Sequence, residues 1–207
     1  MKPIFFNLSL TLLLLGAVLP FDARGQANPD NQEKCLGGSL DAPIRLDVFS
    51  DFQCTHCRDF FLNTIPSVLK DYCSLNKVCV VYHEYPLRNN TYSRKAAQYS
   101  LAAQKLGREP WHSVMTALYQ HQENWAQTGN VDEVVAKVLT ADEYSRLKKL
   151  VLDPSLDTAI DSDIALGNKN EVTSTPTILV NALGREQKVV GFIPFPVLKD
   201  FFDSIVK

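Results

Sequence analysis

Apolar residues follow two different periods along the chain, and the change from one to the other divides it into segments. Short runs rich in β-branched and aromatic residues predict strands at 44–50 and 77–85 and, much later, a hairpin with strands at 177–180 and 187–190. Apolar residues at helical spacing predict the helices 59–72, 92–106, 111–121, 131–139, 141–152, 154–167 and 196–206. This order predicts an α/β fold that is interrupted once by a helical block of about 75 residues, too long for a single crossover between strands.

The first residues have the pattern of an export signal. Lys2 precedes an apolar run over 8–19, and small residues follow, so that residues 1–27 predict a secretory signal with cleavage near 25–27. An uncleaved membrane anchor is the alternative, but the apolar run is shorter than the roughly 20 residues that a membrane span needs. The polar residues 28–41 are expected to form a tether, and the exported protein is expected to be periplasmic or secreted.

Composition excludes some classes of function. Of the 207 residues 45% are hydrophobic, and the formal net charge is −2. These values are typical of a globular chain and give no electrostatic basis for binding nucleic acid.

The run Cys54-Thr55-His56-Cys57 places two thiols one helical turn apart, directly after the predicted strand 44–50. At the start of a helix, unpaired backbone N–H groups and the helix dipole stabilise a thiolate, which is the form of cysteine that attacks disulfides. A partly protonated imidazole at His56 would lower the pKa of Cys54 further and make the oxidised pair a stronger oxidant. We therefore predict a redox-active pair, with Cys57 as the more shielded, resolving thiol.

Two other interpretations of this motif exist. It could be half of a zinc site, but no second CxxC or paired histidines follow at ligand spacing, and the positions of His83, His112 and His121 do not form a metal-binding pattern. It could also be an inert structural disulfide, although the start of a helix favours a labile bond. We expect no metal and no cofactor.

Three more cysteines remain for an oxidising compartment. Cys73 ends a predicted helix and Cys79 enters the next strand, so a short turn could join them in a structural disulfide. Closing this loop would stabilise the fold by about 2.4 kcal/mol in the chain-entropy model. Cys35 would then be free or paired with another molecule.

Four motifs together carry a resemblance to a known family: Asp41-Ala42-Pro43, the run from Phe49 to Cys57, Tyr85-Pro86-Leu87, and Thr173-Ser174-Thr175-Pro176-Thr177. With them the chain resembles the DsbA-like branch of the thioredoxin superfamily, in which a helical domain is inserted into a thioredoxin fold. The resemblance spans about 36–206. It implies a thioredoxin-like domain made of 42–90 and 171–207, with an inserted helical domain at 91–170.

The resemblance also implies roles for single residues. The bond between Thr175 and Pro176 is expected to be cis, with its loop facing the dithiol, so that Thr175 can offer backbone groups to an extended peptide. The family's buried acid, six residues before the first cysteine, is replaced here by Val48. Water or another group, such as Glu84, would then exchange protons with the second thiol. Asp51 is expected either to cap the helix or to act chemically.

Taken with the motif, the resemblance predicts a thiol:disulfide oxidoreductase that acts as an oxidase on cysteine-containing exported proteins. It also implies a membrane partner that reoxidises the dithiol. A reductase, an isomerase, or a peptide-binding chaperone with a structural disulfide are the alternatives; an isomerase is less favoured because no dimerisation domain precedes the fold. We expect a monomer.

Overall fold

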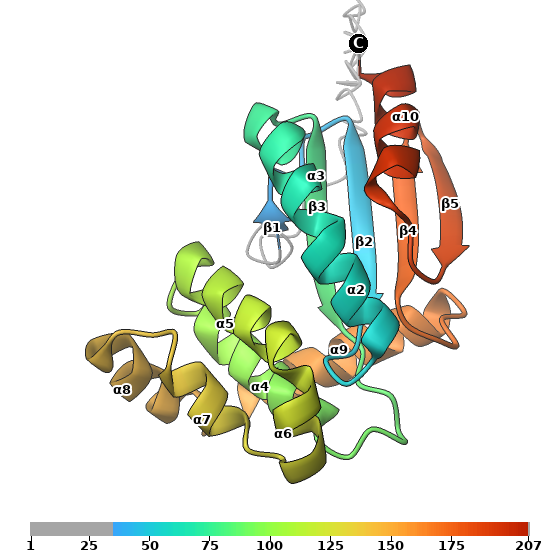
Figure 1. Cartoon of the computed structure of the whole chain (residues 1–207). Coiled ribbons are helices and arrows are strands. Elements are labelled where there is room, and N and C mark those ends of the chain that lie inside the picture. The colour runs from blue at the N-terminus through green and yellow to red at the C-terminus, as the bar shows by residue number, and fades with distance from the viewer. Residues whose placement is uncertain (1–34, 207) are drawn as a thin grey trace, which may run out of the picture.

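A five-stranded sheet forms the centre of the computed structural model, which describes residues 35–206 (Figure 1). Its strands lie in the order β1 (Cys35–Gly37), β3 (Val78–Glu84), β2 (Ile44–Ser50), β4 (Thr177–Ala182) and β5 (Arg185–Val190). β2 and β3 are parallel, and all other neighbours are antiparallel. The predicted signal segment lies outside the described residues.

Helices cover both faces of this sheet (Figure 1). One face carries α2 (Thr55–Asn63), α3 (Ile65–Asp71), the short 3₁₀ turn η1 (Cys73–Leu75) and the last helix, α10 (Phe195–Ile205). Six helices lie between β3 and β4: α4 (Ser93–Gln104), α5 (Arg108–Gln120), α6 (Gln122–Thr128), α7 (Val131–Ala136), α8 (Ala141–Leu150) and α9 (Ser155–Lys169). The predicted α/β fold with an inserted run of helices is therefore confirmed, and from β2 onward the strands follow one another along the chain as predicted.

The inner strand β3, which lies between β1 and β2, has no solvent-facing side, because all seven of its residues are buried. Successive side chains of a strand point to opposite faces. Val78, Val80 and Tyr82 accordingly belong to the large core shared with α2, α3 and α10, whereas Cys79 and Val81 pack on the other face, beside Cys35. This division decides where the cysteines of the chain can meet.

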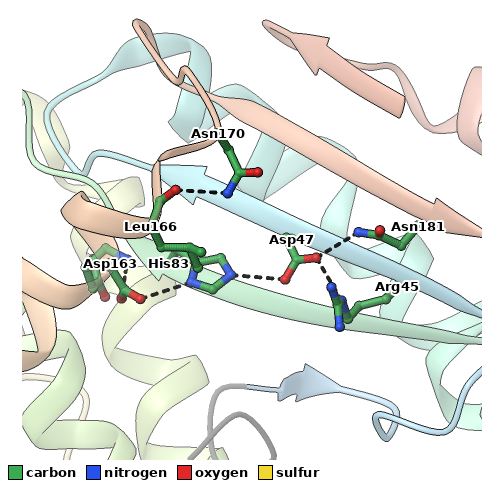
Figure 2. A network of polar contacts seen from close by, with 8 residues as sticks. Arg45, Asp47, His83, Asp163, Leu166, Asn170 and Asn181 are labelled. Atoms are coloured by element: carbon green, nitrogen blue, oxygen red, sulfur yellow. Dashed lines mark hydrogen bonds and ion pairs between the residues drawn. The ribbon is translucent and has the colours of Figure 1, made fainter. Parts of the chain in front are cut away.

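A buried polar network joins α9 to the face of the sheet opposite α2, α3 and α10 (Figure 2). His83 is hydrogen bonded to Asp47 of β2 at 3.1 Å and to Asp163 of α9 at 3.0 Å. Arg45 and Asn181 donate to the same Asp47 carboxylate. Burial alone would lower the pKa of His83, but the hydrogen bonds and charges of its two carboxylate partners outweigh burial and raise it. The imidazole of His83, hydrogen bonded between two carboxylates, thus joins the sheet to the helical insertion.

Three sequence predictions of local structure are wrong in detail. The predicted helix 59–72 begins earlier, at Thr55, and is divided at Thr64, because Pro66 has no N–H to donate to the preceding turn. The second half of the predicted tether is not free, since β1 pairs with β3 as an edge strand. Helix α6 was not predicted at all.

Between residues 35 and 206, no helix is both long enough and apolar enough to cross a lipid bilayer.

Candidate active site

The two thiols of the CxxC motif occupy different environments although they are one helical turn apart. Cys54 is the N-cap residue of α2 in an extended conformation and is partly exposed. Cys57 lies in the first turn and has no exposed surface. The motif therefore presents one accessible sulfur and one shielded sulfur, as predicted from the placement of the motif after β2.

The surroundings of Cys54 favour its thiolate. Its pKa is lowered to about 6, first by a hydrogen bond from the Cys57 thiol, then by the side chain of Thr175 and by the backbone N–H groups of Cys57 and His56; partial burial opposes these effects. Hydrogen bonds that stabilise the charged form are a direct cause of such a shift. At neutral pH Cys54 is thus mainly a thiolate.

The surroundings of Cys57 favour its protonated form. Burial raises its pKa well above that of an ordinary thiol, and the hydrogen bond to Cys54 and the charge of Cys54 raise it further. The N–H of Asp51, 3.5 Å from Cys57 Sγ, and the hydroxyl of Ser50 work against this rise. The pair consequently contains one ionised nucleophile and one protonated thiol that can stabilise it.

The loop before β4 forms the opposite wall of the site. The peptide bond between Thr175 and Pro176 is cis, as the resemblance implies. Cys54 Sγ lies 3.2 Å from the Thr175 carbonyl oxygen, to which it donates when Cys54 is a thiol. The N–H of Gly191 donates to the Pro176 carbonyl at 2.7 Å and holds the loop in place. When Cys54 is a thiol, the buried Thr175 hydroxyl has no hydrogen-bond partner among the described residues. Its hydrogen can therefore be donated to Cys54 when that sulfur is a thiolate.

Asp51 ties the active-site turn to the chain that leads into the helical insertion. Its buried carboxylate accepts from the N–H groups of Gln53 and Leu87, at 2.6 and 2.7 Å. It also accepts from the Asn90 amide at 2.9 Å and from the Ser93 hydroxyl. None of these donors belongs to α2, whose N-cap residue is Cys54 without a side-chain cap hydrogen bond, so the predicted capping of this helix by Asp51 is wrong and a chemical role stays a prediction.

The imidazole of His56 is exposed, and the contribution of His56 to the low Cys54 pKa comes from its backbone N–H. The pKa effect predicted for its side chain stays a prediction. Glu84, in contrast, is almost fully buried at the end of β3, where it pairs in register with Ser50. Its charge contributes to the raised pKa of the neighbouring Tyr82. A proton relay through Glu84 also stays a prediction.

The predicted disulfide between Cys73 and Cys79 is wrong. Cys73 belongs to the core on the α2 and α3 side of the sheet, whereas Cys79 projects from β3 to the opposite side. The thiol of Cys79 is instead hydrogen bonded to Cys35, and all five cysteines are free thiols in the structure. The strand passes between Cys73 and Cys79, so short separation along the chain does not bring them together.

Sequence reasoning missed two glutamines that shape the site. Gln122, at the start of α6, donates to the carbonyls of Phe52 and Cys54, at 2.7 and 3.1 Å. Gln53 donates to the carbonyl of Ala126 at 3.0 Å. These three hydrogen bonds join residues 68 to 73 positions apart, so no local sequence pattern predicts them. Together they fix the CxxC turn against the insertion.

No group of three or more His, Cys, Asp or Glu side chains within residues 35–206 is arranged to hold a metal ion.

Comparison with known proteins places this geometry in a family. The family model described as thioredoxin matches residues 30–189. Disulfide bond formation protein D of Bacillus subtilis is 23% identical over 174 residues, which are 82% of this chain and 76% of that protein. A probable disulfide bond formation protein D of Bacillus cereus is 23% identical over 148 residues, which are 70% of this chain and 68% of that protein.

Solved structures show the same fold. The oxidised form of BdbD from Bacillus subtilis superimposes with a TM-score of 0.68 at 20% identity, covering 87% of this chain and 95% of that one. The α-DsbA1 protein of Wolbachia pipientis gives a TM-score of 0.67 at 20% identity, covering 81% of this chain and 88% of that one.

A thioredoxin fold with an inserted helical domain, together with an asymmetric dithiol facing a cis-proline loop, defines the class of DsbA-like thiol:disulfide oxidoreductases. The chain belongs to the thioredoxin family, and its fold and site resemble those of the DsbA-like proteins.

Proposed function

We propose that this protein is an extracytoplasmic oxidase that introduces disulfides into exported proteins through Cys54 and Cys57. The observation that carries the proposal is the low pKa of Cys54 beside a buried Cys57. A stabilised thiolate favours the reduced form of the pair, and this makes the oxidised form a stronger oxidant.

The reaction follows from the exposure of the two sulfurs. A substrate thiolate attacks Cys54 Sγ in the oxidised pair; a bond forms between those two sulfurs, the Cys54–Cys57 bond breaks, and its electron pair remains on Cys57. A second thiolate of the substrate then attacks the substrate sulfur in the mixed disulfide and releases Cys54 as a thiolate. The substrate is oxidised by two electrons, and the CxxC pair is reduced by two.

Substrate is expected to bind beside the cis-proline loop. The Thr175 carbonyl lies at the Cys54 sulfur, where an extended peptide can pair with the loop in the manner of an added strand. A membrane protein that carries a disulfide would then reoxidise the pair. The signal pattern of residues 1–27 supports action outside the cytoplasm.

The reduction potential of the Cys54–Cys57 pair tests this proposal. The other three cysteines are replaced by alanine rather than serine, because all three are buried, and the protein is equilibrated with a series of glutathione redox buffers. A potential near or above about −150 mV supports an oxidase, a value below about −230 mV indicates a reductase, and an intermediate value favours isomerisation.

A chaperone is separated from an oxidoreductase by a second test. With Cys54→Ser and Cys57→Ser combined, an oxidoreductase loses all oxidation of a reduced model protein. A chaperone that only binds peptide beside the cis-proline loop would still suppress aggregation of that protein.

A further inference from the structure

A chain of three buried hydroxyl groups ends at the less accessible sulfur of the active site. Ser50 is the last residue of β2, and its hydroxyl is within hydrogen-bonding reach of Cys57. The hydroxyls of Ser50 and Tyr119 are hydrogen bonded at 2.9 Å, and Tyr119 is in turn hydrogen bonded to Tyr82. These contacts bring together β2, β3 and α5, which belongs to the helical insertion.

Packing holds the middle of this chain in place. The Tyr119 side chain has no exposed surface, and its ring lies 4.8 Å from that of Phe52 and 4.9 Å from that of Phe61, measured between centroids. Ser50 and Tyr82 are also buried. A buried hydroxyl without a partner is costly, so an ordered chain of hydroxyls in an apolar core must be satisfied along its length.

The hydrogens of this chain can adapt to the state of Cys57. Three hydroxyls share two internal hydrogen bonds, so one hydrogen is left over for an end of the chain. When Cys57 is a thiolate, that hydrogen can be donated by Ser50 to the sulfur while Tyr82 donates to Tyr119 and Tyr119 to Ser50. Burial raises the pKa of both tyrosines, so both keep their protons and remain donors.

We infer that Ser50, Tyr119 and Tyr82 form a hydrogen-bond donor chain that stabilises the negative charge on Cys57 whenever this sulfur is the leaving group or the nucleophile. Ser50 contacts the reacting atom, and the two tyrosines act as positioning residues through it. Aligned hydrogen bonds polarise one another, so the effect of Ser50 on the sulfur is strengthened by the two phenols behind it. This inference rests on the proposed function of the Cys54–Cys57 pair.

This hydrogen-bond donor chain acts in the step that breaks or forms the active-site disulfide. When a substrate thiolate attacks Cys54, the electron pair of the Cys54–Cys57 bond moves to Cys57, where the chain donates a hydrogen bond. In the reverse step the Cys57 thiolate attacks Cys54 in a mixed disulfide and expels the substrate thiolate. The hydroxyls keep their protons in both directions.

The inference is tested with Ser50→Ala, Tyr119→Phe and Tyr82→Phe in the full chain. Each oxidised variant is mixed rapidly with reduced glutathione, and the rate at which the Cys54–Cys57 disulfide is reduced is divided by the glutathione thiolate concentration. We expect this rate to fall about tenfold for Ser50→Ala and about threefold for Tyr119→Phe, with a smaller change for Tyr82→Phe, since a hydrogen bond to a charged group is lost or weakened. The pH midpoint for resolution of a preformed mixed disulfide with glutathione should rise in the same order.

Tyr99→Phe is the matched control. It removes a phenol of the helical insertion that donates to Asp132 at 2.7 Å, away from Cys57. Loss of stability alone would affect this variant and Tyr119→Phe alike without moving the pH midpoint.

An active wild-type protein with unchanged rates and midpoints in folded Tyr119→Phe and Ser50→Ala would overturn this inference alone. A wild-type protein whose Cys54–Cys57 disulfide does not react with glutathione would overturn the proposed function and this inference with it.

Discussion

The ionisation of Cys54 gives the sharpest quantitative prediction. With a pKa of about 6, about nine tenths of Cys54 is thiolate at pH 7, compared with about one hundredth for a thiol with an ordinary pKa near 9. The reduced form is thereby stabilised about tenfold at pH 7, because Cys57 stays protonated. For a two-electron couple, this tenfold factor raises the reduction potential by about 30 mV.

The largest cause of the low pKa can be removed separately. Cys57→Ala deletes the thiol that donates to Cys54, whereas Cys57→Ser keeps a donor at the same position. A hydrogen bond to a charged group contributes about 1.5 kcal/mol or more, which corresponds to about one pKa unit. We expect the Cys54 pKa to rise by about that amount in Cys57→Ala and by clearly less in Cys57→Ser.

The measurement is the ultraviolet absorbance of the thiolate in reduced protein as a function of pH. It is combined with iodoacetamide alkylation and mass mapping of the peptides. Mapping is needed because the pKa of Cys35 is also lowered, by its hydrogen bond with Cys79. A Cys54 midpoint near pH 8.5 in the wild type, or equal midpoints in the two Cys57 variants, would refute this account of the site.

Three further predictions concern the scaffold. Asp51→Ala leaves four donors without their acceptor and should lower the free energy of unfolding by about 3 kcal/mol in urea titrations; Asp51→Asn, which keeps one acceptor oxygen, should cost less, and equal values would contradict the role given to the carboxylate. The folded-state pKa of His83 is raised, so its stabilisation is complete below its unfolded pKa of about 6.5 and is lost as pH rises through the folded value. Compared with His83→Gln, the wild type should therefore lose stability on going from pH 6 to pH 9, and parallel pH profiles would show that the imidazole is not protonated. Mass mapping of oxidised protein should find no peptide that joins Cys73 to Cys79, and any bridge outside the CxxC pair should join Cys35 to Cys79.

The parts of the fold that the sequence predicts are those set by local periodicity. The strands β2 and β3 and most helices of the insertion were located within a few residues, because their apolar spacing is determined within each segment. The edge strand β1 has only three residues and is defined by its pairing with β3. No periodicity can show so short a strand, and the polar residues before it suggested a tether.

The residues of the active site also fall into two groups: those that local sequence patterns predict and those that only the folded structure brings together. The spacing of Cys54 and Cys57 and their placement after a strand predicted them as the redox pair, and the resemblance pointed to Pro176, whose peptide bond is cis. The pairing of Cys79 could not be predicted because every residue of β3 is buried, so no alternation of polar and apolar residues shows which side chains share a face. The carboxylate of Asp51 was named, but its partners at Leu87, Asn90 and Ser93 are 36 to 42 residues away.

The loop of Thr175 and Pro176, which faces Cys54, affects the point during folding at which Cys54 becomes reactive. The sulfur and the carbonyl of Thr175 are separated by 121 residues of sequence, and the loop reaches the sulfur only after β4 has paired with β2. A chain made from its N-terminus therefore carries both cysteines of the motif before the Thr175 side chain, one of the groups that lower the pKa of Cys54, is in place. Contacts between distant segments form late in folding. Until then the pKa of Cys54 is lowered only by the local donors of the CxxC turn, so the full stabilisation of its thiolate depends on the pairing of β4 with β2.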